Sequence, residues 1–354
     1  MKIDFLINSL SSGGAERVMT TLANAFSEKK NDVRLITFND NDFYKLNTNV
    51  KRVKLHHGLI KNHTIRSLIN LFSFLYNKNS RPDILISFLP QNNLITIVVA
   101  KILGIKLIIS EHSNHKVEVS SKIKKIRKYL YKYADFTTVL TSFDVSFYES
   151  LGAKVSVMAN PIVLPNKINK FENRKKNILI AGSLNRFKLK GFDSLLHIIN
   201  PILKSNPDWT LTIAGTGEKG MLKLKDIVRV LNIEEQVIFT GFCENIEELM
   251  QNSQIFILSS QYEGLPMVLM EALSNGMSCI AYDCISGPRD LITDNKNGLL
   301  IENQNAKLMR DGILKLINDD NLRKKLAENS PLSVDKYSVE NIMQQWKDLI
   351  LKID

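Results

Sequence analysis

Short apolar runs and amphipathic segments alternate along the first half of the chain. The runs lie at residues 3–10, 33–38, 83–88, 106–110 and 136–140, and segments with a helical spacing of apolar residues separate them. Runs that are apolar at consecutive positions are typical of strands buried on both faces. The alternation therefore predicts an α/β fold with a parallel sheet covered by helices.

The same pattern begins again in the second half. It follows a polar, proline-containing stretch at 159–176, and its apolar runs lie at 177–182, 210–214, 237–242, 255–259 and 278–282. A polar stretch between two such series is typical of a domain linker. We expect two Rossmann-like, doubly wound parallel-sheet domains, 1–163 and 164–338, facing each other across a cleft. A last helix within 339–354 can pack on either domain, including a crossing back to the first.

Composition narrows the class of protein. The chain has 354 residues, of which 44% are hydrophobic and 23% charged, as in globular proteins. We find no run of 18 or more apolar residues, so we expect no membrane-spanning helix. The charged N-terminus is unlike a signal peptide. The three scattered cysteines show no metal-ligand spacing and indicate a reducing compartment, so the cytoplasm is the expected location.

The net charge is confined to the first half of the chain. Residues 1–160 contain 23 Lys and Arg against 12 Asp and Glu, a net +11, whereas residues 161–354 contain 24 of each. Nucleic acid and an anionic membrane surface are both possible partners of such a half.

A basic amphipathic helix is expected at 120–136. Its apolar stripe is formed by Ile123, Ile126, Leu130 and Tyr133. The stripe can face lipid, or it can pack on the sheet. If it packs on the sheet, the cations are either merely solvated or in contact with lipid phosphates. The candidate membrane-binding residues are Lys122, Lys124, Lys125, Arg127, Lys128 and Lys132.

A strand–loop–helix unit in the second half has the most specific pattern. The run 255–259 leads into Glu263-Gly264-Leu265-Pro266-Met267, where Pro266 suits a first helical position, and Glu271 follows inside the helix. The unpaired N–H groups of the first turn form an anion site. If the whole segment is helical, the two carboxylates lie about 12 Å apart. Two carboxylates that act on the same anomeric carbon lie closer together, so this distance fits contacts with the two ends of a nucleotide sugar better. The alternative is an ordinary unit with Glu271 solvated.

Three further loops follow predicted strands and therefore lie where parallel sheets bind ligands. The turn that begins Ser11-Ser12 contains Gly13 and Gly14. These glycines either let a phosphate approach the backbone closely or form a plain tight turn. The full G-x-G-x-x-G spacing of dinucleotide-binding loops is missing. His112 either faces a ligand or packs internally. Arg186, Lys188 and Lys190 either bind a diphosphate or belong to a solvated loop. Weaker signals for contact with a flat base are Gly215, Gly217 and Phe242.

Together these residues resemble glycosyltransferase family 4, whose members are retaining enzymes with the GT-B fold. Glu263 and Glu271 match the E-x7-E motif of the family, with the usual Gly264-Leu265-Pro266 between them. The GGAER, SEHSN and GPRDLI…NGLLI segments are most similar to those of bacterial transferases that extend lipid-linked oligosaccharides or capsule-type glycans, some of which transfer N-acetylgalactosamine.

The resemblance implies a role for each motif. Glu271 would bind the ribose, Glu263 and His112 the transferred sugar, and Arg186 and Lys190 the diphosphate. The N–H groups of Leu265–Met267 would assist, and Gly13 and Gly14 would face the donor phosphates or the acceptor. The chain departs from the family at Ser183, where an arginine usually follows the glycine, so Arg186 and Lys188 compete as its replacement.

We therefore expect a retaining glycosyltransferase that moves a sugar, for example GalNAc, from a UDP-sugar to a polyprenyl-diphosphate-linked glycan in bacterial surface polysaccharide or oligosaccharide synthesis. It would act as a peripheral protein on the inner face of the cytoplasmic membrane. No metal is expected, because fixed cations and a helix N-terminus can stabilise the leaving UDP and no D-x-D-like pair ends a strand. The alternatives are a non-transferring GT-B enzyme, such as a UDP-sugar 2-epimerase, and a basic nucleic-acid-binding or scaffold protein. The lysines are not interleaved with stacking aromatics, which disfavours nucleic acid.

Overall fold

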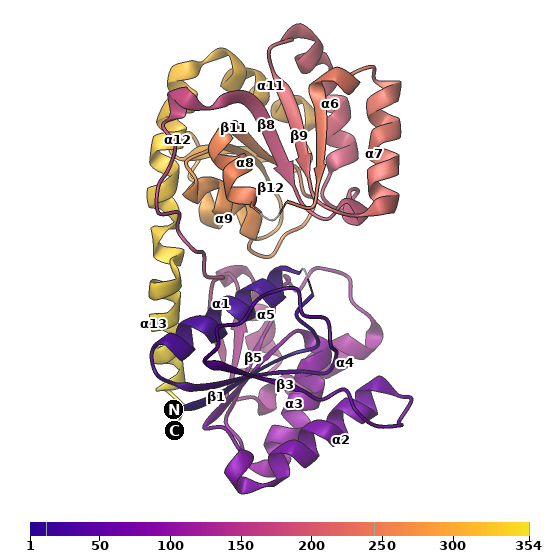
Figure 1. Ribbon diagram of the computed structural model, residues 1–354, viewed down its shortest axis with the longest axis vertical. Coiled ribbons are helices and arrows are strands. Elements are labelled where there is room, and N and C mark those ends of the chain that lie inside the picture. The colour runs from indigo at the N-terminus through magenta and orange to yellow at the C-terminus, as the bar shows by residue number, and fades with distance from the viewer. Residues whose placement is uncertain (12, 244, 354) are drawn as a thin grey trace. The chain divides into compact units, whose positions relative to one another are not determined.

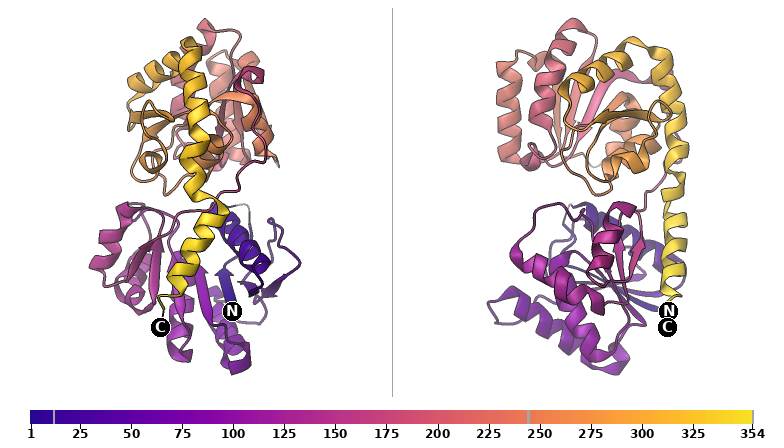
Figure 2. Two further views of the ribbon diagram at one scale, coloured as in Figure 1. Left: turned by 90° about the vertical axis from the view of Figure 1, so that its left-hand side faces the viewer. Right: turned by 180° about the vertical axis from the view of Figure 1, so that it is seen from behind.

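The computed structural model describes residues 1–11, 13–243 and 245–353, and the chain forms two compact units (Figure 1). Unit 1 comprises Met1–Pro161 and the C-terminal segment from Val339, and unit 2 comprises Ile162–Ser338. Each unit is a parallel sheet with helices on both faces (Figure 2), which confirms the predicted fold class.

The sheet of unit 1 has seven strands in the order β3-β2-β1-β4-β5-β6-β7, with every pairing parallel. The central strands are fully buried because helices cover both faces, which explains their continuous apolar runs. The strands are β1 Lys2–Ile7, β2 Asp32–Thr37, β3 Val50–Lys54, β4 Ile84–Phe88, β5 Leu107–Ser110, β6 Phe136–Val139 and β7 Val155–Val157.

Six α-helices of the described chain belong to unit 1. They are α1 Gly14–Glu28, α2 His63–Tyr76, α3 Pro90–Leu103, α4 Ser121–Leu130, α5 Val145–Ser150 and α13 Val339–Ile350. Helix α3 packs between α2 and α4, and these three form one layer on the sheet. Helix α13 packs against α1, and its buried Trp346 stacks on Phe88 with ring centroids 6.4 Å apart.

The sheet of unit 2 has six parallel strands in the order β10-β9-β8-β11-β12-β13. The strands are β8 Lys175–Ala181, β9 Thr210–Ala214, β10 Val237–Gly241, β11 Ser253–Leu258, β12 Ser278–Asp283 and β13 Gly298–Glu302. The helices are α6 Phe192–Ser205, α7 Glu218–Val230, α8 Ile246–Asn252, α9 Met267–Ser274, α10 Pro288–Leu291, α11 Ala306–Asn318 and α12 Asp320–Val334. No helix in the described residues is both long and apolar enough to cross a bilayer.

Two local expectations are wrong. Pro266 is the N-cap of α9 and not its first residue, with φ −70° and ψ 104° in the extended region. The predicted basic helix at 120–136 ends as an α-helix at Leu130 and continues as a 3₁₀ turn, Tyr131–Tyr133, in which Tyr131 is buried and Tyr133 exposed. The inward stripe therefore includes Tyr131 in place of Tyr133.

Candidate active site

The order of strands in unit 2 predicts that a ligand binds at the loops after β8 and β11. From the central β8 the chain proceeds outward to β9 and β10, and it then returns to β11 on the other side of β8. Ligands of open α/β sheets bind at such a reversal, beyond the carboxyl ends of the strands.

The loops after β8 and β11 meet at Lys190 and Glu263. The Nζ atom of Lys190 lies 2.7 Å from Oε1 of Glu263, and their side chains are 18% and 11% exposed. The hydroxyl of Ser259 donates to the carbonyl of Lys190 (2.8 Å), and the N–H of Gln261 donates to the carbonyl of Leu189 (2.9 Å). A lysine–carboxylate pair is thus held at these loops by backbone contacts on both sides.

Gly191 explains why the loops can approach so closely. Its φ is +67°, and a Cβ atom there would lie 2.1 Å from the carbonyl oxygen of Ser259. Only glycine combines this backbone conformation with this contact. The same loop presents Arg186 and Lys188 as exposed side chains, so of the three predicted cations the structure brings Lys190 to Glu263.

The start of α9 provides backbone donors beside this pair. The first hydrogen bonds of the helix run from the N–H groups of Leu269 and Met270 to the carbonyl of Pro266. The N–H groups of Met267 and Val268 precede them and point to the helix N-terminus, where an anion is favoured. Pro266 has no N–H, so the predicted donor set Leu265–Met267 is wrong at that residue. The hydroxyl of Ser286 donates to the carbonyl of Gly264 (3.1 Å) and braces the loop.

Glu271 lies inside α9 and is 8% exposed. The alternative of a solvated helix residue is therefore wrong. Glu263 precedes the helix, so the segment is not helical throughout and the spacing derived from helical rise does not apply.

Gly215 and Gly217 have a packing role in the structure. A Cβ atom on Gly215 would lie 1.9 Å from the carbonyl oxygen of Gly182, and one on Gly217 would lie 2.4 Å from the backbone nitrogen of Asn185. Their φ angles of +145° and +139° also favour glycine. These residues join the loops after β8 and β9, and the exposed Phe242 follows β10 at the same edge of the sheet.

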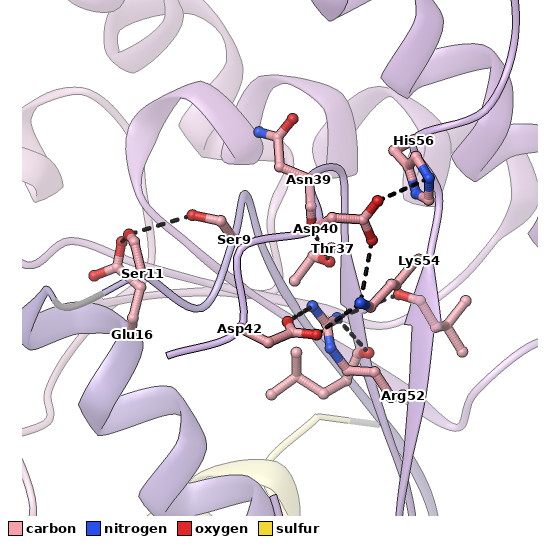
Figure 3. A network of polar contacts seen from close by, with 12 residues as sticks. Ser9, Ser11, Glu16, Thr37, Asn39, Asp40, Asp42, Arg52, Lys54 and His56 are labelled. Carbon is pink, nitrogen blue, oxygen red and sulfur yellow. Dashed lines mark hydrogen bonds and ion pairs between the residues drawn. The ribbon is translucent and has the colours of Figure 1, made fainter. Parts of the chain in front are cut away.

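In unit 1 the corresponding reversal lies between β1 and β4, and the glycine turn follows β1. Gly14 begins α1, and the carboxylate of Glu16 folds back over Gly13, so that a Cβ atom there would lie 2.1 Å from its Oε2. The hydroxyl of Ser11 donates to Glu16 (3.2 Å; Figure 3). Ser12 lies outside the described residues. A carboxylate of the chain itself thus lies at the N-terminus of α1, where the sequence suggests a phosphate.

His112 follows β5 and is held between neighbouring side chains. Its ring packs on Phe88 with centroids 4.2 Å apart, and its Nε2 lies 3.2 Å from the hydroxyl of Ser110. Burial lowers the pKa of His112 from 6.5 to about 3, against the opposing effect of a hydrogen bond with Asn160. The imidazole is therefore neutral at pH 7, a form suited to hydrogen bonding with a sugar hydroxyl.

Arg127 does not belong to the membrane-binding set. It is buried and forms a two-point ion pair with Glu111, at 3.1 and 2.8 Å. Tyr131 also donates to Glu111. Burial alone would lower the pKa of Arg127, but the charge of Glu111 raises it above its ordinary value. The pair anchors α4 to the residue before His112, so its role is structural. The other five predicted cations, Lys122, Lys124, Lys125, Lys128 and Lys132, are exposed.

A second histidine, His115, lies at this edge of unit 1, and no sequence pattern predicted a role for it. Nδ1 of His115 lies 2.7 Å from Oδ1 of Asp144, and the ring is stacked between Phe143 and Phe147 with centroids 5.0 and 4.4 Å apart. Asp144 follows β6, the strand next to β5, so the pairing depends on the sheet order. Only the recurrence of histidine three residues after His112 could have drawn attention to it.

Two doubly wound parallel units, each with polar and glycine-containing loops at its chain reversal, form the architecture known as the GT-B fold. Comparisons with known proteins give the family. Residues 12–164 match the model of Glycosyltransferase Family 4, and residues 165–332 match the model of Glycosyl transferases group 1.

Relatives and solved structures cover both units. The chain is 33% identical to the GalNAc-alpha-(1->4)-GalNAc-alpha-(1->3)-diNAcBac-PP-undecaprenol alpha-1,4-N-acetyl-D-galactosaminyltransferase of Campylobacter jejuni, over 100% of this chain and 99% of that protein. A second Campylobacter jejuni enzyme, N-acetylgalactosamine-N,N'-diacetylbacillosaminyl-diphospho-undecaprenol 4-alpha-N-acetylgalactosaminyltransferase, is 29% identical over 91% of this chain and 92% of its own. The structure of Anabaena HepE in complex with UDP and glucose has a TM-score of 0.84 at 17% identity and covers 99% of this chain and 100% of that one. The chain belongs to glycosyltransferase family 4 and is a glycosyltransferase with the GT-B fold.

Proposed function

We propose that the protein transfers an N-acetylhexosamine, with GalNAc as the first candidate, from a UDP-sugar to a polyprenyl-diphosphate-linked glycan with retention of configuration. The observation that carries the proposal is the 33% identity, over essentially the full length of both chains, to a transferase named for GalNAc and for a PP-undecaprenol acceptor. Two solved relatives that share the fold were crystallised with UDP, which supports a UDP-linked donor.

The donor is proposed to bind at the loops after β8 and β11 of unit 2. Glu271 would accept hydrogen bonds from the ribose hydroxyls, and Glu263 would contact the transferred sugar. Lys190 would neutralise the diphosphate, together with the N–H groups of Met267 and Val268, because a cation and a helix N-terminus both stabilise negative charge. Arg186 and Lys188 are exposed in the same loop and are proposed as secondary phosphate contacts.

In the proposed reaction the bond from the anomeric carbon to the β-phosphate oxygen breaks, and an acceptor hydroxyl forms the new bond on the same face. The proton of that hydroxyl passes to the departing phosphate. The ion pair with Glu263, at 2.7 Å, holds the ammonium of Lys190 in position before UDP leaves. We propose that this fixed charge makes a metal ion unnecessary.

Unit 1 is proposed to bind the acceptor and to lie on the inner face of the cytoplasmic membrane. The exposed lysines of α4 would meet anionic headgroups, since each basic residue near such a surface contributes about 1 kcal/mol. His112 would hydrogen bond to the transferred sugar as a neutral imidazole. We propose no nucleic-acid partner.

The purified protein would be given a panel of UDP-sugars and GDP-mannose with a synthetic polyprenyl-diphosphate glycan, and products would be identified by mass spectrometry. We expect extension of the lipid-linked glycan with a UDP-N-acetylhexosamine. Epimerisation of the donor without transfer to the glycan would contradict the proposed reaction. EDTA is expected to leave the rate unchanged, and a loss of rate that Mn²⁺ restores would contradict the proposed metal independence.

A further inference from the structure

Helices α6 and α11 of unit 2 flank a cavity that the proposed reaction does not use. The two helices pack side by side on the face of the sheet that carries Tyr282 of β12 (Figure 1). The cavity has a volume of about 740 Å³, which lies within the usual range for small-molecule sites. Among the described residues, none that lines it belongs to the loops after β8 and β11, where the donor is proposed to bind. The cavity is therefore separate from the proposed donor site.

The wall formed by α6 combines apolar and hydrogen-bonding groups. Ser194, Ile198 and Pro201 recur at steps of four and three residues, so they lie on one face of the helix beside His197. Pro201 lies inside the helix and has no N–H, so the carbonyl of His197 lacks the hydrogen bond that residue 201 would otherwise donate. This wall thus offers a backbone acceptor for a ligand hydroxyl next to apolar side chains that can cover the C–H face of a sugar ring.

Tyr282 contributes a buried hydroxyl to the cavity. The residue is 4% exposed, and its hydroxyl has no hydrogen-bond partner among the residues that the structure describes. A buried tyrosine hydroxyl normally has such a partner. Burial raises the pKa of Tyr282 above its ordinary value, so the hydroxyl stays protonated at neutral pH and can donate. A ligand in the cavity can provide the missing partner.

The wall formed by α11 is cationic. Lys307 and Arg310 are exposed and lie three residues apart, so both side chains project from one face of the helix. No Asp or Glu is found among the described residues that line the cavity. Asp311 is the ion-pair partner of Arg310, at an exposed and loose 3.6 Å, which leaves N–H groups of the guanidinium available. Two neighbouring cations on a wall without acids complement a phosphate group.

We propose that the cavity between α6 and α11 is a second ligand site, which binds a sugar phosphate. Lys307 and Arg310 would hold the phosphate, and the hydroxyl of Tyr282 and the carbonyl of His197 would bind sugar hydroxyls. A free phosphate would leave Tyr282 and the apolar wall unused, and a neutral sugar would leave the cations unused. The inference goes beyond the proposed function, because neither UDP nor the lipid-linked glycan is assigned to this cavity.

The test is a ³¹P NMR titration of the full-length protein with glucose 6-phosphate, N-acetylglucosamine 6-phosphate and glucose 1-phosphate. Saturating UDP is present, so that the proposed donor site is occupied. We expect at least one of these esters to bind with a dissociation constant of about 1 mM or below, because two charged hydrogen bonds hold its phosphate. Glucose alone, followed by saturation-transfer NMR, should bind at least about tenfold more weakly.

Variants assign the binding to the cavity. K307A combined with R310A should weaken binding of the ester at least about tenfold, because both charge-assisted hydrogen bonds are lost. K223A combined with K325A removes the same charge from exposed lysines of unit 2 outside the cavity, and this matched control should stay within about twofold. Tyr282→Phe removes only the hydroxyl and should weaken binding about two- to tenfold. UDP affinity equal to that of the wild type verifies that each variant is folded.

Three results would overturn the inference. The first is that none of the three esters binds to the wild type in the presence of UDP. The second is wild-type affinity for the ester in K307A/R310A. The third is an equal loss in K223A/K325A, which would show that net charge alone attracts the ester. None of these results bears on the proposed transfer, since they concern a cavity that the reaction does not use.

Discussion

At the scale of single residues, the contact between Lys190 and Glu263 is the feature that the sequence could only partly predict. The E-x7-E spacing identified Glu263 and Glu271, and the loop after Gly182 offered three cations. Which cation meets Glu263 depends on the left-handed turn at Gly191 and its contact with the carbonyl of Ser259, a long-range feature that spacing does not encode. The burial of Glu271 likewise follows from packing and not from its position in a helical pattern.

Replacement of Lys190 tests the proposed role of this contact. We expect Lys190→Met to lower kcat/KM about 100-fold or more, because it removes a fixed charge from the site of the leaving diphosphate. Lys188→Met removes one of the proposed secondary phosphate contacts and should lose less than about threefold, because Lys188 is exposed. An equal or larger loss in Lys188→Met would transfer the role to Lys188.

Glu271 is expected to contribute to nucleotide binding. Glu271→Gln keeps the side-chain volume in a buried position and should weaken UDP binding about 10- to 100-fold, the usual worth of hydrogen bonds to a charged group. Isothermal titration calorimetry measures the affinity, and a thermal melt verifies that the variant is folded. UDP affinity equal to that of the wild type would exclude the ribose-binding role.

His112 should make the free energy of unfolding depend on pH. The pKa of His112 is about 3 in the folded protein and has its ordinary value of 6.5 in the unfolded chain. As the pH falls, the unfolded chain therefore binds the proton at a higher pH than the folded protein does. The stabilisation is complete above pH 6.5 and declines as the pH falls toward 3, with about 2 kcal/mol lost between pH 7 and pH 5. Urea denaturation at both pH values should show this loss in the wild type and not in His112→Gln; equal losses in the two proteins would contradict it.

At the scale of elements, α4 shows that two basic residues of one helix can have different roles. Arg127→Ala should lower the free energy of unfolding by about 3–5 kcal/mol, because it leaves the buried carboxylate of Glu111 without its ion-pair partner. Lys125→Ala, on the exposed face, should change it by less than about 0.5 kcal/mol. Urea denaturation of both variants makes the comparison, and similar effects in the two would contradict the assignment.

The strands that the apolar runs did not predict are β3, β7 and β13, and all three lie at the edge of a sheet. An edge strand is covered on fewer sides, so its sequence keeps polar residues, as in Val50-Lys51-Arg52-Val53-Lys54. The central strands were found because burial on both faces demands continuous apolar residues.

At the scale of the whole molecule, the alternation of strands and helices sufficed to predict two parallel α/β units. The sequence left open which unit the last helix joins. The structure assigns α13 to unit 1, where Trp346 is buried and stacks on Phe88. Which unit the helix joins depends on the fit between the apolar face of the helix and the surface that receives it. The amphipathic pattern shows only the face of the helix.

The anomeric configuration of the transferred sugar tests the central claim most directly. The protein would be incubated with UDP-GalNAc labelled with ¹³C at the anomeric carbon and with a synthetic polyprenyl-diphosphate glycan, and the product would be examined by NMR. We expect an α-linked GalNAc on the lipid-linked glycan, the configuration that the sugar has in the donor. A β-linked product, or the absence of transfer from any UDP-sugar to this acceptor, would contradict the proposed retaining transfer.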